Sequence, residues 1–167
     1  PNASLIAGEE ALSIWGNWQN QGNNSTAYAG TFITGSKNIS IENMNLYHTA
    51  GLGILSQYSQ DLSFKKVNVI PNPAKNRILS SHDDGLHFSN CRGQVTVDSC
   101  RFIGLMDDPI NVHGTSVKII EKLSDKKLLC KFMHDQSIGF TWAGAGDTIG
   151  FLENEAMNKI GRASCRE

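Results

Sequence analysis

Two short segments of the chain carry acidic doublets in closely similar settings. The first is His82-Asp83-Asp84-Gly85-Leu86-His87-Phe88, and the second is Met106-Asp107-Asp108-Pro109-Ile110-Asn111-Val112-His113. A shift of 24 residues places Asp84 on Asp108. Hydrolysis of a glycosidic bond needs one protonated carboxyl group as acid and a second, ionised carboxylate as base or nucleophile. The doublets therefore predict a hydrolytic site made by Asp84, Asp107 and Asp108, whereas Asp83 is expected only to bond its own turn.

The spacing of the doublets is about the length of one coil of a parallel β-helix. Segments 38–46, 61–69 and 94–102 each alternate apolar and polar residues, which is typical of a half-buried strand. The third segment follows the second by 33 residues instead of 23, so about ten residues are inserted, and we assign the insert to the proline-containing stretch 70–77. Stacked coils lie about 4.8 Å apart. Such stacking would bring Asp84 beside Asp108, while Asp107 can join them only at a turn.

A second strand of each coil is expected where 50–54, 84–88 and 108–112 align. In that alignment the apolar residues Leu86, Phe88, Ile110 and Val112 point inward, and Gly53, His87 and Asn111 form an outward row. His87, Asn111 and His113 are candidate contacts to sugar hydroxyls, although an outward histidine is often only solvated. Asn45 above Asn68 predicts amides that hydrogen-bond from coil to coil. Trp15 and Trp18 form either a sugar-stacking platform or a packing contact.

Composition limits the class of protein. The 167 residues are 40% hydrophobic with a net charge of −1, and they show no basic patch, so a nucleic-acid partner is not expected. No apolar run approaches the length of a membrane span. No spacing matches a recognised metal motif, so we expect neither a metal nor another cofactor. Three or four cysteines leave both a Cys91–Cys100 disulfide and free thiols open.

Three regions are expected. Residues 1–114 hold the coils, and residues 115–159 read as the start of an inserted antiparallel β-barrel module, with a hairpin over 117–132 and strands at 139–142 and 146–152. Residues 160–167 fit no periodic pattern, and one choice of codons for them spells a sequencing-library adapter. We therefore expect this tail to be non-native. The chain opens at Pro1 without a methionine and reads as a segment of a longer protein.

Four stretches of the chain resemble the α-1,3-galactosidases of glycoside hydrolase family 110. The specific part is the pair Asp-Gly-x-His and Asp-Asp-x-Ile-Asn-Val-His-Gly-Thr, and the matching stretches are 31–45, 50–57, 83–93 and 100–115, with a continuation at 134–140. The resemblance implies an all-β fold, a right-handed parallel β-helix with inserted β-barrels. It also implies a secreted, periplasmic or cell-surface bacterial enzyme that removes terminal α-1,3-linked galactose from glycans by inversion, without a metal.

Carried over residue by residue, the resemblance implies three catalytic aspartates, Asp84, Asp107 and Asp108. We assign Asp107 as the acid and Asp84 with Asp108 as the base. Inversion wants carboxyl groups roughly 6.5–9.5 Å apart, whereas simple stacking gives a shorter separation. Two other classes stay open: a polygalacturonase-like β-helix hydrolase, although the Gly-His-Gly and Arg-Ile-Lys segments typical of that class are absent, and a β-helix that binds glycans without cleaving them.

Overall fold

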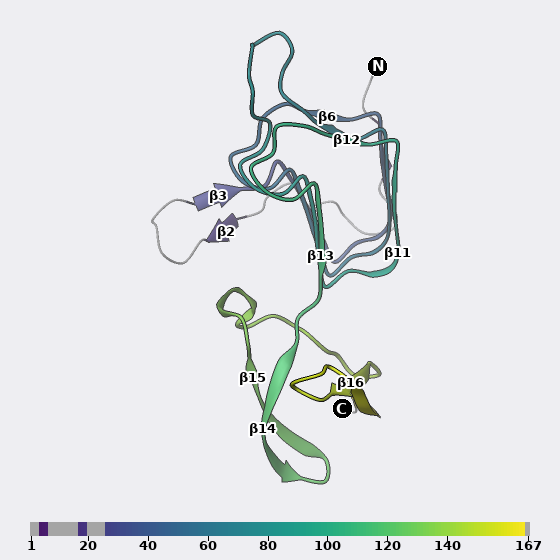
Figure 1. Cartoon of the computed structure of the whole chain (residues 1–167). Helices are drawn as coiled ribbons and strands as arrows, with labels where there is room; N and C mark the ends of the chain where they lie inside the picture. Colours follow the sequence, from purple (N-terminus) through teal and green to yellow (C-terminus); the bar gives the residue numbers. More distant parts are fainter. Residues whose placement is uncertain (1–3, 7–16, 20–25, 166–167) are drawn as a thin grey trace. The chain divides into compact units, whose positions relative to one another are not determined.

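The computed structural model describes the backbone of residues 4–6, 17–19 and 26–165, and side chains from residue 29 onward. The chain divides into two compact units, 1–114 and 115–167. Within the described ranges the structure is all-β, apart from one turn of 3-10 helix, η1, at Asp135–Ser137. Figure 1 shows the first unit as a stack of coils, in purple to teal, and the second as separate hairpins, in green to yellow.

The first unit is built from three parallel sheets, because each pass of the chain adds one strand to each sheet (Figure 1). The first sheet stacks β4 (Thr31–Thr34), β7 (Ile54–Gln57), β10 (Leu86–Ser89) and β13 (Ile110–His113). The second stacks β5 (Lys37–Glu42), β8 (Gln60–Lys65) and β11 (Arg92–Asp98), with β1 (Ser4–Ile6) antiparallel to β5. The third stacks β6 (Asn45–Leu46), β9 (Asn68–Val69) and β12 (Arg101–Phe102).

Each predicted nine-residue strand is in fact two strands joined by a corner. The corner residue between β5 and β6 is Asn43, and Lys66 and Ser99 stand at the same place in the next two coils. All three have φ between 54° and 56°, in the left-handed region that L-residues seldom adopt. The turn redirects the chain without breaking the stack, because the Asn43 N–H donates to the Lys65 carbonyl and the Lys66 N–H to the Asp98 carbonyl one coil further.

The register of the coils differs from the sequence alignment at the insert. Ser81 pairs with Thr49 across 32 residues, whereas Leu62 pairs with Val95 across 33, because an irregularity between Arg92 and Val95 adds one residue. Residues 73–77 of the insert, and residues 78 and 79 after it, are exposed and form no strand. The predicted row of Gly53, His87 and Asn111 is therefore wrong in one member. His87 pairs with Asn111 as expected, but its neighbour in the preceding coil is Leu55.

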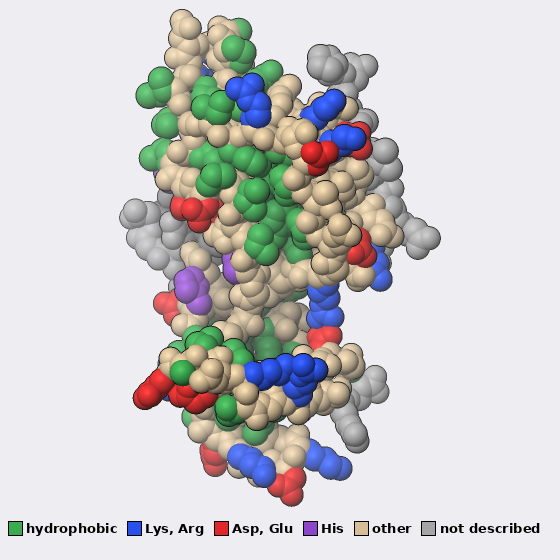
Figure 2. All heavy atoms as spheres, turned by 45° about the vertical axis from the view of Figure 1, so that its right-hand side comes forward, with side chains coloured by type: hydrophobic (Ala, Val, Ile, Leu, Met, Phe, Trp, Pro, Cys, Tyr) green, Lys and Arg blue, Asp and Glu red, His purple; other side chains and the backbone are tan. Residues whose placement is uncertain are grey.

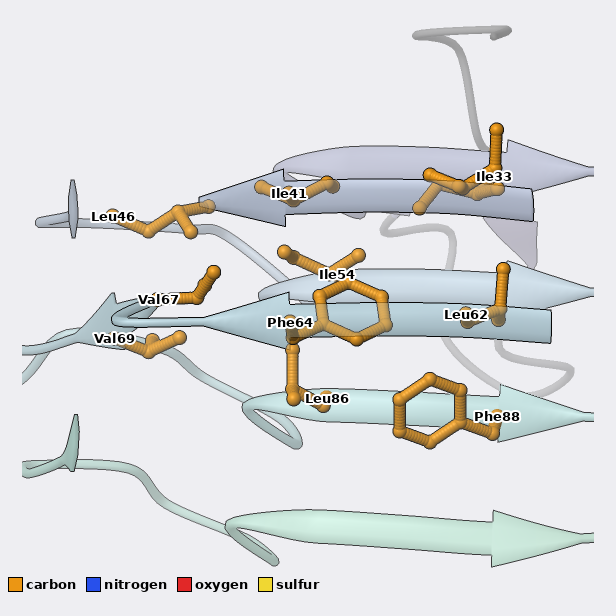
Figure 3. Close-up of a cluster of buried hydrophobic side chains, with 11 residues drawn as sticks. Ile33, Ile41, Leu46, Ile54, Leu62, Phe64, Val67, Val69, Leu86 and Phe88 are labelled. Carbon is orange, nitrogen blue, oxygen red and sulfur yellow. The ribbon is translucent and has the colours of Figure 1, made fainter. Parts of the chain in front are cut away.

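The core lies inside the three sheets of the first unit, and Figure 3 shows its side chains converging from successive coils. Leu86 and Phe88 are 0% and 1% exposed, as their inward prediction requires, and the Phe64 and Phe88 rings meet edge to face with centroids 5.5 Å apart. The predicted amide contact is confirmed, because Asn68 Nδ2 donates to Asn45 Oδ1 at 2.8 Å.

Ile110 and Val112 stack in register on Leu86 and Phe88, but they are 41% and 66% exposed. Their register with these two buried residues agrees with the predicted inward direction, although the side chains themselves are not buried. The physical reason is that β13 is the last strand of its sheet, so within the described residues no further strand covers it. Figure 2 shows hydrophobic side chains gathered on the surface of this unit.

The described residues of the second unit form two antiparallel hairpins and η1. β14 (Val117–Ser124) pairs with β15 (Lys127–Phe132), which confirms the predicted hairpin with its turn at Asp125 and Lys126. β16 (Thr148–Leu152) pairs with β17 (Lys159–Ser164), so residues 160–164 of the tail proposed as non-native lie in a strand. The strand expected at 139–142 is wrong. That stretch is irregular, since it follows η1, whose N-cap His134 accepts a hydrogen bond from the Gln136 N–H.

β2 (Asn17–Gln19) and β3 (Thr26–Tyr28) form a further antiparallel hairpin of the first unit (Figure 1). Trp15 lies outside the described residues, as does the side chain of Trp18. The two readings of this indole pair therefore stay predictions. All four cysteines are free thiols, and Cys91 and Cys100 stand at different corners of the third coil. Among the described residues, no helix is long and apolar enough to cross a membrane.

Candidate active site

The two acidic doublets occupy equivalent bends in adjacent coils. Each bend begins at a bridge residue, Ser81 or Leu105, and ends where β10 or β13 begins. The backbones are tied directly together, because the Gly85 N–H donates to the Asp108 carbonyl at 2.9 Å and the Leu86 N–H to the Pro109 carbonyl at 3.0 Å. The recurrence of the doublet at coil spacing therefore does place Asp84 next to Asp108.

The three predicted acids lie together. Asp84, Asp107 and Asp108 each offer a carboxylate oxygen, and these oxygens all lie within 4.8 Å of one another. The Asp108 N–H donates to Asp107 Oδ1 at 3.0 Å and to Asp84 Oδ1 at 3.2 Å. This shared donor at the bend before Pro109 turns Asp107 toward the same side as its neighbour. Consecutive residues of a straight strand would face opposite ways, so the bend is what assembles the group.

The acids differ sharply in their surroundings. Asp84 is only 4% exposed, whereas Asp107 and Asp108 are exposed. One carboxylate is thus held at the base of the group, and two face solvent, where a substrate can reach them. Asp83 is not a member of the group. It accepts a hydrogen bond from His82 Nδ1 at 2.8 Å and its N–H donates to the Gly51 carbonyl, so its contacts are local but are not the bond to its own turn that the sequence predicted.

Two histidines extend the hydrogen-bonded group from Asp84. His87 Nδ1 bonds Asp84 Oδ2 at 2.7 Å, and His87 Nε2 bonds His113 Nε2 at 2.8 Å, with the rings nearly perpendicular at 85°. His113 Nδ1 then meets the Gly114 carbonyl at 3.3 Å. His113 is one coil and two residues away from His87, a diagonal neighbour on the same face.

The three residues predicted to contact a sugar differ in their exposure and in their hydrogen-bond partners. His87 is 5% exposed and uses both ring nitrogens within the protein. His113 is exposed, and Asn111 is half-buried beside His87 in β13. A contact of Asn111 or His113 with a sugar stays a prediction. The link from His87 to Asp84 was missed by sequence reasoning, although the separation of three residues across the bend at Gly85 was visible.

A column of small residues lets the coils approach closely beside the acids. Gly30, Gly53 and Gly85 occupy the residue just before β4, β7 and β10, and Pro109 takes that place before β13. A Cβ on Gly85 would lie 2.7 Å from the Pro109 carbonyl oxygen and 2.7 Å from Phe102 Cδ1. Glycine is needed there because any side chain would push apart the two bends that carry the carboxylates.

The charge of the group is uncompensated by lysine or arginine. Within the described part of the chain, no such side chain forms an ion pair with Asp84, Asp107 or Asp108. Neighbouring carboxyl groups are what general acid and general base catalysis of glycoside hydrolysis require. Three carboxylate oxygens could also attract a divalent cation, with water completing its coordination.

Comparisons with known proteins find relatives of both units. A family profile described as GLAA-B beta-barrel domain II matches residues 127–167. The chain is 50% identical to "Alpha-1,3-galactosidase B" of Bacteroides thetaiotaomicron over 133 residues, which are 80% of this chain and 22% of that protein. It is 41% identical to "Alpha-1,3-galactosidase A" of Bacteroides fragilis over 138 residues, 83% of this chain and 23% of that protein.

A third relative comes from a different genus. "Alpha-1,3-galactosidase A" of Akkermansia muciniphila is 39% identical over 123 residues, which are 74% of this chain and 21% of that protein. The resemblance predicted from the acidic motifs is confirmed: the chain is homologous to curated proteins named α-1,3-galactosidase, whose names indicate glycoside hydrolases. It spans between a fifth and a quarter of the length of these relatives.

Proposed function

We propose that the chain is a segment of an exo-acting glycoside hydrolase of family 110 that releases terminal α-1,3-linked galactose from glycans. The observation that carries the proposal is the grouping of Asp84, Asp107 and Asp108 within 4.8 Å. These are the residues of the motif by which the chain resembles the α-1,3-galactosidases, and those relatives match about four fifths of it. We further propose that the three stacked parallel sheets are part of a right-handed parallel β-helix and that the second unit is part of an inserted β-barrel.

The exposure of the acids supports a division of roles. Asp107 is exposed, and among the described residues its carboxyl group accepts a hydrogen bond from the Asp108 N–H alone, so it can turn toward a leaving oxygen. We propose Asp107 as the general acid. Asp84 is held by two hydrogen bonds and Asp108 stacks on it, so the two share the water that attacks the anomeric carbon, as the base pair of the reaction.

Inversion of the anomeric centre is a separate and more detailed part of the proposal. Inverting enzymes keep their carboxyl groups about 6.5–9.5 Å apart, so that a water fits between acid and base. The nearest oxygens of this group are closer than that. A sugar that enters between Asp107 and the other two acids would increase the separation of the carboxyl groups, provided that Asp107 gives up the hydrogen bond that it accepts from the Asp108 N–H. The exo-acting mode rests on the resemblance to the named relatives alone.

The test is turnover of an α-1,3-galactobioside by the complete enzyme, followed by proton NMR. The first galactose released should be the β-anomer, because inversion of an α-linkage yields β. Release of α-galactose first would leave a galactosidase but reject inversion. Turnover of polygalacturonate in place of the galactoside would instead reject the proposed substrate class.

A pair of matched variants tests the site. Asp107→Asn removes the acid while keeping the size and hydrogen-bonding pattern of the side chain, and it should lower kcat by at least about 10²–10⁴-fold. Asp83→Asn is the control, because Asp83 belongs to the same motif but lies outside the group of acids. Wild-type turnover in Asp107→Asn, or an equal loss in both variants, would contradict the assignment. Galactose binding without turnover by the unmodified enzyme would favour a non-catalytic glycan-binding role.

A further inference from the structure

Asp84 presents a physical problem that the roles above do not solve. Its carboxylate is 4% exposed and has two further carboxylates within 4.8 Å. A buried ionised carboxylate is costly unless it is paired with an opposite charge and hydrogen-bonded. Among the residues with described side chains, Lys and Arg form no ion pair with it. The polar groups that reach it are the His87 ring and the Asp108 N–H.

The direction of the hydrogen bonds is set from one end of the chain of contacts. The Gly114 carbonyl can only accept, so His113 Nδ1 carries a hydrogen in their 3.3 Å contact. One hydrogen must lie between the two Nε2 atoms, which are 2.8 Å apart. One more must lie between His87 Nδ1 and Asp84 Oδ2, which are 2.7 Å apart.

Three hydrogens on these three side chains make the group neutral. Two neutral imidazoles and an ionised carboxylate would hold only two hydrogens and a charge of −1. The third hydrogen either makes one imidazole a cation or protonates Asp84, and in each case the sum of charges is zero. The hydrogen-bond pattern therefore supplies the compensation that lysine or arginine does not.

We propose that Asp84, His87 and His113 form one proton-sharing unit that is electrically neutral in the resting enzyme, in which the two histidines are positioning residues for Asp84. The proposal rests on the proposed function, because it assigns these histidines to the carboxylate and not to the sugar. The unit leaves the remaining charge of the site on Asp107 and Asp108. It also fixes the Asp84 carboxylate from both sides, since Oδ2 meets His87 and Oδ1 meets the Asp108 N–H.

The number of ring hydrogens can be measured directly. The chain has five histidines, so selective ¹⁵N labelling of the 167-residue protein gives few enough imidazole signals to assign with single variants. The expected result near pH 7 is either one imidazolium among His87 and His113, or two neutral rings with the hydrogen of His87 on Nε2 and that of His113 on Nδ1. Two neutral rings with hydrogens on His87 Nδ1 and His113 Nε2 would overturn the proposal, because the unit would then be an anion.

Kinetics of the complete enzyme test the positioning role. His87→Ala should lower kcat by about tenfold or more, with KM changed less than about twofold, because Asp84 loses its alignment while the sugar contacts stay. His87→Asn should recover part of the loss, since the Asn amide nitrogen stands as many bonds from Cβ as Nδ1 does. A raised KM with unchanged kcat would show a sugar contact and reject the role.

A matched control separates this effect from general damage. His82 forms an equally short bond to Asp83 in the same bend, at 2.8 Å, but the pair lies outside the unit, so His82→Ala should keep wild-type kcat and KM. If the unmodified complete enzyme fails to cleave any galactoside, the proposed function fails, but the NMR measurement still decides the proton count. If it cleaves galactosides and the rings show the ordinary anionic arrangement, only the proton-sharing unit is rejected.

Discussion

Substitution of Gly85 is the sharpest test of how the fold assembles the acids. A Cβ at this position would lie 2.7 Å from the Pro109 carbonyl oxygen and 2.7 Å from Phe102 Cδ1, well inside ordinary van der Waals contact. The half-buried Phe102 ring can shift, but the Pro109 carbonyl belongs to the backbone of the next coil and accepts the Leu86 N–H at 3.0 Å. Relief of the clash must therefore stretch the bonds that join the two bends.

The expected cost follows from two contributions. Overpacking of this kind costs about 1–3 kcal/mol, and a weakened backbone hydrogen bond adds about 0.5–1.5 kcal/mol. Alanine recovers about 0.4–1 kcal/mol by restricting the unfolded chain. We expect Gly85→Ala to lower the free energy of unfolding by about 0.5–4 kcal/mol, and to lower turnover of the complete enzyme because Asp84 moves relative to Asp108.

Gly114→Ala is the matched control for this prediction. Its Cβ would meet nothing closer than Asn90 Oδ1 at 3.9 Å, and it gains the same restriction of the unfolded chain. Urea unfolding of the 167-residue chain, followed by circular dichroism, gives both free energies. Equal stability of the two variants within about 0.5 kcal/mol would refute the argument that the coils need glycine at this place.

Three further predictions concern single groups. Hydrogen bonds from the Gln94 N–H and the Gln60 side chain lower the pKa of Asp61, so its carboxylate stabilises the fold above the unfolded pKa of 3.8. This contribution is lost as the pH falls through the folded pKa. Asp61→Asn should therefore make acid unfolding less steep below about pH 4, and an unchanged acid profile would count against this prediction. Burial raises the pKa of the Cys91 thiol, so iodoacetamide should label it more slowly at mildly alkaline pH in the folded chain than in urea, as peptide mass spectrometry would show; equal rates would contradict this. EDTA should leave turnover by the complete enzyme unchanged, and activity restored only by added Ca²⁺ would show that a cation sits among the acids.

The grouping of the acids was accessible from the sequence because it depends on one simple quantity, the length of a coil. The doublets recur at 24 residues, and no insert lies between them, so the alignment of Asp84 with Asp108 holds in the structure. The sequence predicted that Asp107 could face the same side as Asp108 only if the chain turns before Pro109. In the structure the Asp108 N–H donates to both Asp107 and Asp84 at this turn, which holds the two carboxylates on one side.

The errors have equally physical origins. The insert before Ser80 hides the true shift of 32 residues, so Gly53 was set beside His87 instead of Gly85. The corners at Lys66 and Ser99 carry no glycine, and nothing local marks them as left-handed; the stacked hydrogen bonds hold them in that conformation. The Asp84–His87 contact depends on the bend at Gly85, which a strand pattern does not show.

The stack of equivalent backbone positions that contains Asp84 shows how a protein of this kind can acquire new residues for chemistry. The same backbone place holds Leu52 in the preceding coil, where it is 5% exposed, and carboxylates in the next two. The reactive side chains thus occupy equivalent positions of a repeating backbone, and the backbone follows the same path whichever side chain stands there. New chemistry on this architecture can arise by substituting the side chain at the equivalent position of a neighbouring coil, without any change in the path of the backbone.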